Sequence, residues 1–165
     1  MTTNASANSD ELPTLGILAE LDPKLRRLLA SHGRFETLDP GTYLIKQNDD
    51  HHALSVIIQG NLLVSCHAHG DYVDLATLGP GHTVGEMSVI DPQKSSADVK
   101  VGEYPVRLWT IEGGEFNDMI DSDLEIGAAI MKILAKEMCR RLRQNSDHML
   151  NQADTLRTHF LDIDY

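Results

Sequence analysis

Between about Phe35 and Ile111, the apolar positions recur in short runs that are typical of β-strands. The runs are rich in Val, Ile, Leu and Tyr, and Gly, Pro, Asn and Asp separate them. Many short strands at spacings of roughly 8–12 residues indicate an antiparallel sandwich or barrel. Turn-forming pairs that contain glycine recur between the runs. The predicted strands are 42–45, 53–58, 61–66, 72–78, 97–101 and 106–111, and the predicted turns are Pro40-Gly41, Gly60-Asn61, Gly70-Asp71 and Pro80-Gly81.

Helical periodicity precedes and follows this β region. Leucines at spacings of three and four predict a helix over 15–31, for which Asp22-Pro23 supplies a cap and a proline at the first helical position. A short helix is predicted after Gly114, and a longer one begins after a cap at Asp121-Ser122 and continues to about Thr158. The expected organisation is a disordered segment 1–12 and one domain over 13–160, with the β region at about 35–112 and C-terminal helices at about 114–158.

The long C-terminal helix carries an apolar repeat of seven residues, formed by Ala135, Leu142, Met149 and Leu156. Such a repeat resembles a coiled-coil seam and predicts a homodimer through this helix. The alternative is that these side chains belong to the core of a single chain. Five of the 14 basic residues lie between Lys132 and Arg143, either as a solvated helix face or as a contact surface for an acidic partner protein.

Length and charge narrow the classes of function. A chain of 165 residues corresponds to about one domain, and 25 acidic against 14 basic residues give a net charge of −11. This balance disfavours a DNA binder that relies on its whole surface, and the sequence leaves no room for a helix-turn-helix module before Tyr165, so direct DNA binding is not expected. The sequence shows no apolar run long enough for a membrane helix and no secretory signal, so no membrane association is expected. Cys66 and Cys139 match no metal spacing, and we interpret them as reduced thiols of a cytoplasmic protein.

The segment from Gly81 to Ala97 carries the candidate chemistry. A strand ends at its glycines, and a short helical turn over Glu86–Ile90 follows. The first residues of such a turn direct backbone N–H groups outward and form an anion site. Gly85 allows a ligand to approach the backbone closely, and Glu86 offers a carboxylate to hydroxyl donors. The alternative interpretation is a capped turn that only closes the barrel.

Together with several other motifs in the same order, this segment resembles the cyclic nucleotide-binding domain family, specifically the bacterial catabolite-activator type of regulator. The resemblance covers about residues 14–158 and implies an antiparallel β-roll flanked by an N-terminal helix and a long C-terminal helix. The motifs that carry it are Lys46-Gln47-Asn48-Asp49, Ile57-Ile58-Gln59-Gly60, Gly85-Glu86-Met87-Ser88-Val89-Ile90, Ser95-Ser96-Ala97 and Arg140-Arg141-Leu142, with spaced glycines at 41, 60, 81 and 85.

The resemblance also implies roles for individual residues, with cAMP or cGMP as the possible ligand and no other cofactor. Glu86 would accept a hydrogen bond from the ribose 2′-hydroxyl, and the backbone N–H groups of Met87 and Ser88 would hold the cyclic phosphate. Asn145 and Ser146 fall at the positions that face the purine base.

The family's phosphate-binding arginine is replaced by Ser95, although Ser96 and Ala97 match the pattern. A guanidinium clamps a phosphate through two charge-assisted hydrogen bonds, so its loss weakens binding. The segment 35–118 holds 13 acidic but only four basic residues, which further disfavours an anion. Lys94 is adjacent to Ser95 and is the candidate substitute.

Other polar residues have simpler interpretations. His67, His69 and Asp74 approach the metal motif of the cupins, but they flank a predicted hairpin tip, where an exposed turn is expected. The pair His51-His52 is likewise expected to be solvated. Cys66 and Trp109 are predicted to pack in the barrel. No serine has a recognisable partner base, so an enzyme is not expected.

Two main functional hypotheses follow, beside a third, a metal-dependent enzyme of the cupin type. The first is a regulatory module that binds a small phosphate-bearing ligand at Gly85–Ser96 and signals through its C-terminal helix to a dimer mate or an unknown partner protein. The second is a degenerate domain that binds no nucleotide and acts in dimerisation or protein interaction.

Overall fold

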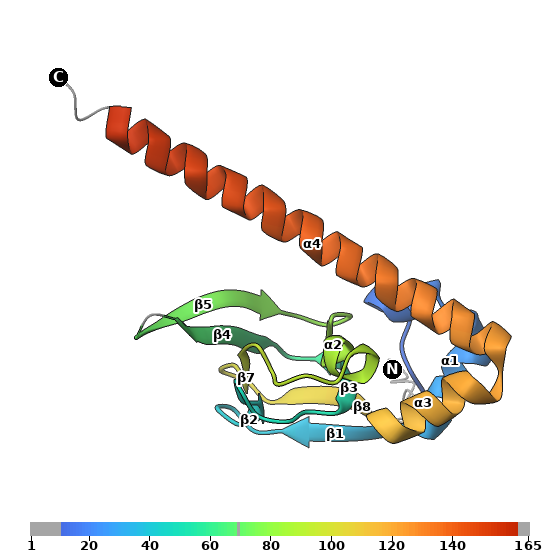
Figure 1. The fold of residues 1–165 in the computed structure, drawn as a ribbon. Helices are drawn as coiled ribbons and strands as arrows, with labels where there is room; N and C mark the ends of the chain where they lie inside the picture. The colour runs from blue at the N-terminus through green and yellow to red at the C-terminus, as the bar shows by residue number, and fades with distance from the viewer. Residues whose placement is uncertain (1–10, 69, 162–165) are drawn as a thin grey trace, which may run out of the picture. The chain divides into compact units, whose positions relative to one another are not determined.

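The computed structural model describes residues 11–68 and 70–161 and divides the chain into two compact units, one up to Ala128 and the other from Ala129. Each unit is described by itself. Within the first unit, the described residues form two antiparallel four-stranded sheets (Figure 1). The first sheet has the order β1-β8-β3-β6 and the second β2-β7-β4-β5. The strands are β1 (Arg34–Leu38), β2 (Tyr43–Ile45), β3 (Ala53–Gln59), β4 (Leu62–Ala68), β5 (Asp71–Leu78), β6 (Thr83–Val84), β7 (Asp98–Val101) and β8 (Val106–Glu112).

The inner faces of the two sheets form one hydrophobic core. Leu108 of β8 and Ile57 of β3, which face each other in the first sheet, are fully buried. From the second sheet, Leu62 and Val101 pair across β4 and β7 and join the same cluster. The whole cluster consists of Ile45, Ile57, Leu62, Val84, Val99, Val101, Val106 and Leu108. Residues that alternate along each strand therefore meet between the sheets, as expected for a sandwich or roll.

The opposite face of β8 is also buried. Trp109 and Ile111 are at most 1% exposed, and Gly33 lies directly against the Trp109 ring. Phe116 and Leu18, from segments at either end of the roll sequence, are equally buried. Strand β8 therefore contributes alternate side chains to apolar packing on both of its faces, which explains its nearly continuous apolar sequence.

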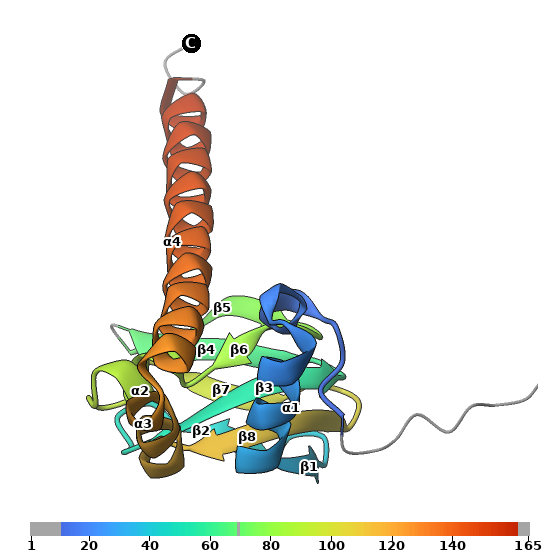
Figure 2. The ribbon, with the colours of Figure 1, turned by 90° about the vertical axis from the view of Figure 1, so that its right-hand side faces the viewer.

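Helices precede and follow the strands in sequence, and one short helix, Glu86–Ile90, lies between β6 and β7. The helices are η1 (Gly16–Glu20, a 3₁₀-helix), α1 (Pro23–His32), α2 (Glu86–Ile90), α3 (Gly113–Ser122) and α4 (Leu124–Leu161). The helices α1 and α3 lie at one end of the roll, and the β4–β5 hairpin extends at the other (Figures 1 and 2). No helix in the part of the chain that the structure describes is both long and apolar enough to cross a membrane.

The helix caps confirm one prediction and correct another. The Asp22 side chain accepts hydrogen bonds from the backbone of Lys24 and Leu25 at 2.8 and 2.9 Å, so the predicted cap of α1 is confirmed. The cap of α4 is Asp123 rather than Asp121-Ser122. Its carboxylate accepts from Glu125 N at 3.0 Å, whereas the Ser122 hydroxyl donates back to a carbonyl in α3.

The predicted fold class is confirmed, and all six predicted strands are present with small shifts of their ends. Two strands, β1 and β6, were not predicted. The four turn glycines at 41, 60, 70 and 81 all have positive φ. Of the segment predicted to be disordered, residues 1–10 lie outside the described residues, and Leu12 is buried at 5% exposure.

Candidate functional site

The predicted ligand-binding segment begins at Gly85, which caps α2 with φ of 80°. A β-carbon built on Gly85 would lie 2.0 Å from the carbonyl oxygen of Ala53 and 2.9 Å from Nε2 of His51. Real contacts of a β-carbon are not that short. Both the left-handed backbone and this close approach therefore require glycine, and they fix the point at which the chain turns from β6 into α2.

The first turn of α2 presents a buried acid followed by exposed backbone. Glu86 is only 6% exposed, whereas Met87 is 58% exposed. The Ser88 N–H already donates to the Gly85 carbonyl at 3.1 Å, so a phosphate would have to share this donor. The Met87 N–H lies in the first turn, where a helix supplies no acceptor for its amides. The first turn of α2 therefore combines a buried Glu86 with an exposed Met87, and the roles of Glu86, Met87 and Ser88 toward a ligand stay predictions.

The His51 side chain lies close to Gly85, at the start of this turn. Its Nε2 lies 2.9 Å from the Ala53 carbonyl oxygen, the same oxygen that faces Gly85. The His51 side chain is partly buried, and this burial lowers its pKa below the ordinary value, although the bond to Ala53 acts in the opposite direction. The prediction that His51 and His52 are both solvated is correct for His52 and wrong for His51. No sequence motif indicated the approach of His51 to Gly85, because the two residues are distant in sequence.

The end of the predicted ligand segment is tied to the turn before β3. Asn48 takes a positive φ of 68°, and its N–H donates to the Ser95 carbonyl at 2.8 Å. In return the Ser95 N–H donates to the Asp49 carbonyl at 3.0 Å. Ser95 is partly buried, and its neighbour Ser96 is exposed. We call Asn48, Asp49 and Ser95, with these two hydrogen bonds, the backbone clasp.

Lys94 does not stand as an unpaired cation beside Ser95. Its Nζ lies 2.9 Å from Oδ2 of Asp50, and the two side chains are 62% and 67% exposed. The hydrogen bond from Lys94 holds the pKa of the Asp50 carboxyl below its ordinary value. The sequence indicated Lys94 as a substitute for the missing arginine, but it did not indicate this partner.

Gln47 anchors the same turn to the second sheet. Its backbone N–H donates to Oδ1 of Asp98 at 2.8 Å, and Asp98 is buried at 7% exposure. The Gln47 side chain accepts from the His67 N–H at 2.7 Å and donates to the His67 carbonyl at 3.4 Å. Hydrogen bonds of Gln47 and of the backbone clasp therefore connect the Lys46–Asp49 turn to β4, to β7 and to the end of the ligand segment.

The other candidate residues, Asn145 and Ser146, belong to α4 within the second unit. The Asn145 side chain is exposed, and the Ser146 hydroxyl donates to the Leu142 carbonyl at 2.9 Å. The structure describes this unit by itself, so the base-facing roles of Asn145 and Ser146 stay predictions.

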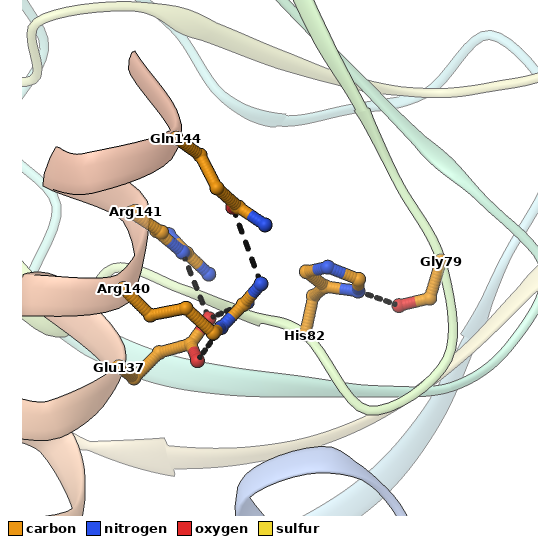
Figure 3. A network of polar contacts seen from close by, with 6 residues as sticks. All are labelled: Gly79, His82, Glu137, Arg140, Arg141 and Gln144. Carbon is orange, nitrogen blue, oxygen red and sulfur yellow. Dashed lines mark hydrogen bonds and ion pairs between the residues drawn. The ribbon is translucent and has the colours of Figure 1, made fainter. Parts of the chain in front are cut away.

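One turn earlier on α4, four side chains form a polar network (Figure 3). Glu137, at 5% exposure, accepts from Arg140 at 2.6 Å and from Arg141 at 3.0 Å, and Arg140 also donates to Gln144 at 3.2 Å. Burial alone raises the pKa of the Glu137 carboxyl, but the two guanidinium groups outweigh it and hold the pKa below its ordinary value. A separate contact in Figure 3 joins His82 Nδ1 to the Gly79 carbonyl at 3.0 Å.

The predicted seam of α4 is exposed where its side chains are described. Leu142 is 67% and Met149 61% exposed, and Leu150 beside them is 67% exposed. The side chain of Leu156 lies outside the described residues. Contact of these apolar side chains with a second helix, which the heptad spacing predicts, stays a prediction.

The alternative metal motif gains no support from the residues that are described. His67 packs edge-on against the Tyr72 ring, with 4.8 Å between ring centroids, and His69 lies outside the described residues. Among the side chains that the structure describes, no three His, Cys, Asp or Glu gather closely enough to hold a metal ion.

The two side chains predicted to pack in the barrel differ in burial. Trp109 is 1% exposed and confirms the prediction. Cys66 is only partly buried on β4, where it pairs with the 40% exposed Val73. The strands β4 and β5 therefore become less buried toward their hairpin.

A cavity of about 310 Å³ lies elsewhere in the first unit, between α1 and α3. None of the predicted site residues lines it. Its lining is mainly polar and consists of Ser31, His32, Glu115, Asp118, Met119 and Ser122.

Comparison with known proteins identifies the fold and its family. The family model for the cyclic nucleotide-binding domain matches residues 35–123, which include both the Lys46–Asp49 turn and the segment Gly85–Ser96. The chain therefore belongs to the cyclic nucleotide-binding domain family. A search of curated proteins finds no match.

Solved structures support the same assignment. The chain is 26% identical to the catabolite activator protein of Thermus thermophilus, with a TM-score of 0.70, over 84% of this chain and 62% of that one. It is also 26% identical to the N-terminal domain of a transcriptional regulator from Streptomyces coelicolor, with a TM-score of 0.65, over 81% and 90% of the two chains. A cyclic nucleotide-binding domain from Methylobacillus flagellatus shares the fold at 21% identity, with a TM-score of 0.76, over 80% and 74% of the chains.

Proposed function

We propose that this chain is a non-catalytic regulatory domain of the cytoplasm that binds a small phosphate-bearing ligand, cAMP or cGMP, at Gly85–Ser96. The observation that carries the proposal is the geometry of Gly85. Its positive φ and its contact with Ala53 hold the first turn of α2 in one position, with Glu86 buried and Met87 exposed. Family membership over 35–123 supplies the class of ligand.

In this proposal each residue of the segment has a separate task. The Met87 and Ser88 amides donate to the phosphate, and the Glu86 carboxylate accepts from a ribose hydroxyl. The burial of Glu86 fixes the direction of its carboxylate before the ligand arrives, which reduces the entropy lost on binding. Asn145 and Ser146 contact the base from α4.

The affinity is expected to be low. A hydrogen bond to a charged group contributes about 1.5–3 kcal/mol, so replacement of the arginine by Ser95 weakens binding by roughly one to two decades. The Met87 and Ser88 amides remain as the proposed donors, whereas the Ser95 N–H already donates to the Asp49 carbonyl.

We further propose that ligand binding is signalled through α4. A ligand that contacts both the segment Gly85–Ser96 and the base-facing residues of α4 would bind one arrangement of the helix better than others and would shift the population toward it. The exposed Leu142 and Met149 would pass this change to a second copy of the helix in a homodimer. An unknown partner protein could read the same change.

The alternative function is a dimerising scaffold without nucleotide binding. The exposed apolar side chains of α4 favour it, because they account for a dimer without any ligand. The replacement of the arginine by Ser95 and the engagement of Lys94 by Asp50 favour it as well.

Isothermal titration calorimetry with cAMP and with cGMP separates the two functions. The regulatory function predicts saturable heat, which weakens when Glu86→Gln removes the carboxylate. The matched control is Glu103→Gln, which removes one carboxylate outside the segment and is expected to leave the heat unchanged. No heat with millimolar nucleotide, together with an intact dimer, would support the scaffold.

A further inference from the structure

Lys94 is the basic side chain adjacent to Ser95, and its contacts can be compared with those of the other basic residues of the segment 35–118. The segment 35–118 holds four basic residues. The ammonium groups of Lys46 and Lys100 lie 5.5 and 5.3 Å from the centroid of the Tyr43 ring. Arg107 likewise lies over an aromatic ring, that of Phe35, at 4.9 Å. Lys94 pairs with an exposed carboxylate, that of Asp50, and is itself 62% exposed, so another anion can reach it.

The backbone clasp keeps the two partners within reach of each other. Lys94 precedes Ser95, and Asp50 follows Asp49, so each partner is bonded covalently to a residue of the clasp. The carboxylate is therefore present beside the ammonium at a high effective concentration, whatever the concentration of free ligand. Because Asp50 is exposed, its attraction for Lys94 is screened and weak, and a competing anion can replace it.

We propose that Asp50 is an internal competitor for Lys94, so that a bound phosphate takes the Lys94 ammonium from the Asp50 carboxylate. The proposal rests on the proposed function and names the residue that limits its affinity. Asp50 is a positioning residue in this scheme, because it acts on the ligand only through Lys94. The exchange breaks one ion pair and forms another, and no covalent bond changes.

Neutral replacement of Asp50 tests this directly. In Asp50→Asn the amide keeps the size of the side chain but releases the ammonium, so binding of cAMP or cGMP is expected to tighten by about twofold to fivefold, the range that exposed ion pairs span. Lys94→Met is expected to weaken binding. The double variant is expected to bind like Lys94→Met, because there is then no ammonium group for which Asp50 and the phosphate compete.

Two controls separate this exchange from a general effect of charge. Asp49→Asn removes one negative charge from the same turn and is expected to change the affinity less than Asp50→Asn does. Asp50→Glu restores a carboxylate and is expected to restore the affinity of the unmodified chain. The side chains of Asp49, Asp50 and Lys94 are all exposed, so thermal unfolding of each variant is expected to match the unmodified chain.

Each outcome of the calorimetry has one meaning. One result is that the unmodified chain binds nucleotide with the same affinity as Asp50→Asn, and another is that Asp50→Asn tightens binding equally in the Lys94→Met background. Either result overturns the proposed competition between Asp50 and the phosphate, and the proposed function stands. If neither the unmodified chain, Asp50→Asn nor Ser95→Arg binds at millimolar nucleotide, the proposed function itself is wrong, and the competition is overturned with it.

Discussion

The backbone of Gly85 and the carbonyl oxygen of Ala53 approach so closely that a β-carbon on Gly85 would lie 2.0 Å from that oxygen. This contact joins the start of α2 to strand β3. The position of the ligand segment therefore depends on a contact that involves no side chain of its own.

The first prediction concerns the stability of this contact. We expect Gly85→Ala to lower the free energy of unfolding by about 2–5 kcal/mol, because the strain of a positive φ adds to the overlap with Ala53. Chemical denaturation followed by circular dichroism measures this change.

Gly70→Ala provides the matched control. Gly70 also has a positive φ, of 93°, but an added β-carbon there has no atom within 4 Å. We expect a loss of only about 1–2 kcal/mol from backbone strain. Equal losses in the two variants would show that the contact between Gly85 and Ala53 is unimportant.

The second prediction concerns the pH dependence of stability. Burial lowers the pKa of His51 in the folded chain below that of the unfolded chain, near 6.5. The neutral imidazole is therefore favoured by folding, so its contribution is fully present above about pH 6.5 and is lost as the pH falls through the unfolded and then the folded pKa.

His51→Gln is expected to reduce this loss of stability between about pH 7.5 and about pH 5.5, since the amide does not titrate and can still donate to the Ala53 carbonyl. His52→Gln, which alters an exposed neighbour, is the control and is expected to keep the pH dependence of the unmodified chain. The same slope in all three proteins would contradict the burial of His51. Urea denaturation at the two pH values gives the slopes.

The third prediction concerns the α4 seam. Leu142→Glu is expected to convert a homodimer into a monomer of 18.3 kDa, because it places a charge on the apolar repeat that includes Met149. Light scattering coupled to size-exclusion chromatography measures the mass. Gln144→Glu introduces the same charge two residues away and is expected to leave the dimer intact. A monomeric mass for the unmodified chain would contradict dimerisation through the α4 seam.

The fourth prediction concerns Glu137, whose carboxylate is buried against two guanidinium groups. Its pKa is lowered on folding, so it stabilises the fold above the unfolded pKa, near 4.3, and this contribution is lost as the pH falls through the folded pKa. Glu137→Gln is expected to destabilise the fold at neutral pH by about 1–3 kcal/mol, because the neutral amide pairs poorly with Arg140 and Arg141. An unchanged free energy of unfolding for Glu137→Gln at neutral pH, measured by chemical denaturation, would contradict a stabilising role of Glu137.

The fold could be predicted well because its signals are local. Glycines at 41, 60 and 81 adopt the positive φ that their turns require, and Asp22 caps α1 through its own side chain. Strand β1 was missed because its sequence alternates weakly and its polar Glu36 is partly buried beside β8, where it accepts a hydrogen bond from Thr110. Strand β6 was missed because it has only two residues.

The candidate site could be predicted only in part. The order of Gly85, Glu86 and Met87 is a property of one short segment, so the sequence reveals it. The approach of Gly85 to His51 and Ala53 and the pair of Asp50 with Lys94 join segments that are distant in sequence, and they depend on how β3 and the clasp are placed. No periodicity or motif in a single sequence carries that information.

The most direct test of the account is calorimetric titration of cAMP and of cGMP into the unmodified chain and into Ser95→Arg. The account predicts weak saturable binding to the unmodified chain and binding that is tighter by roughly one to two decades in Ser95→Arg, because the added guanidinium restores a bidentate phosphate contact. The absence of heat from both proteins at millimolar nucleotide would contradict it.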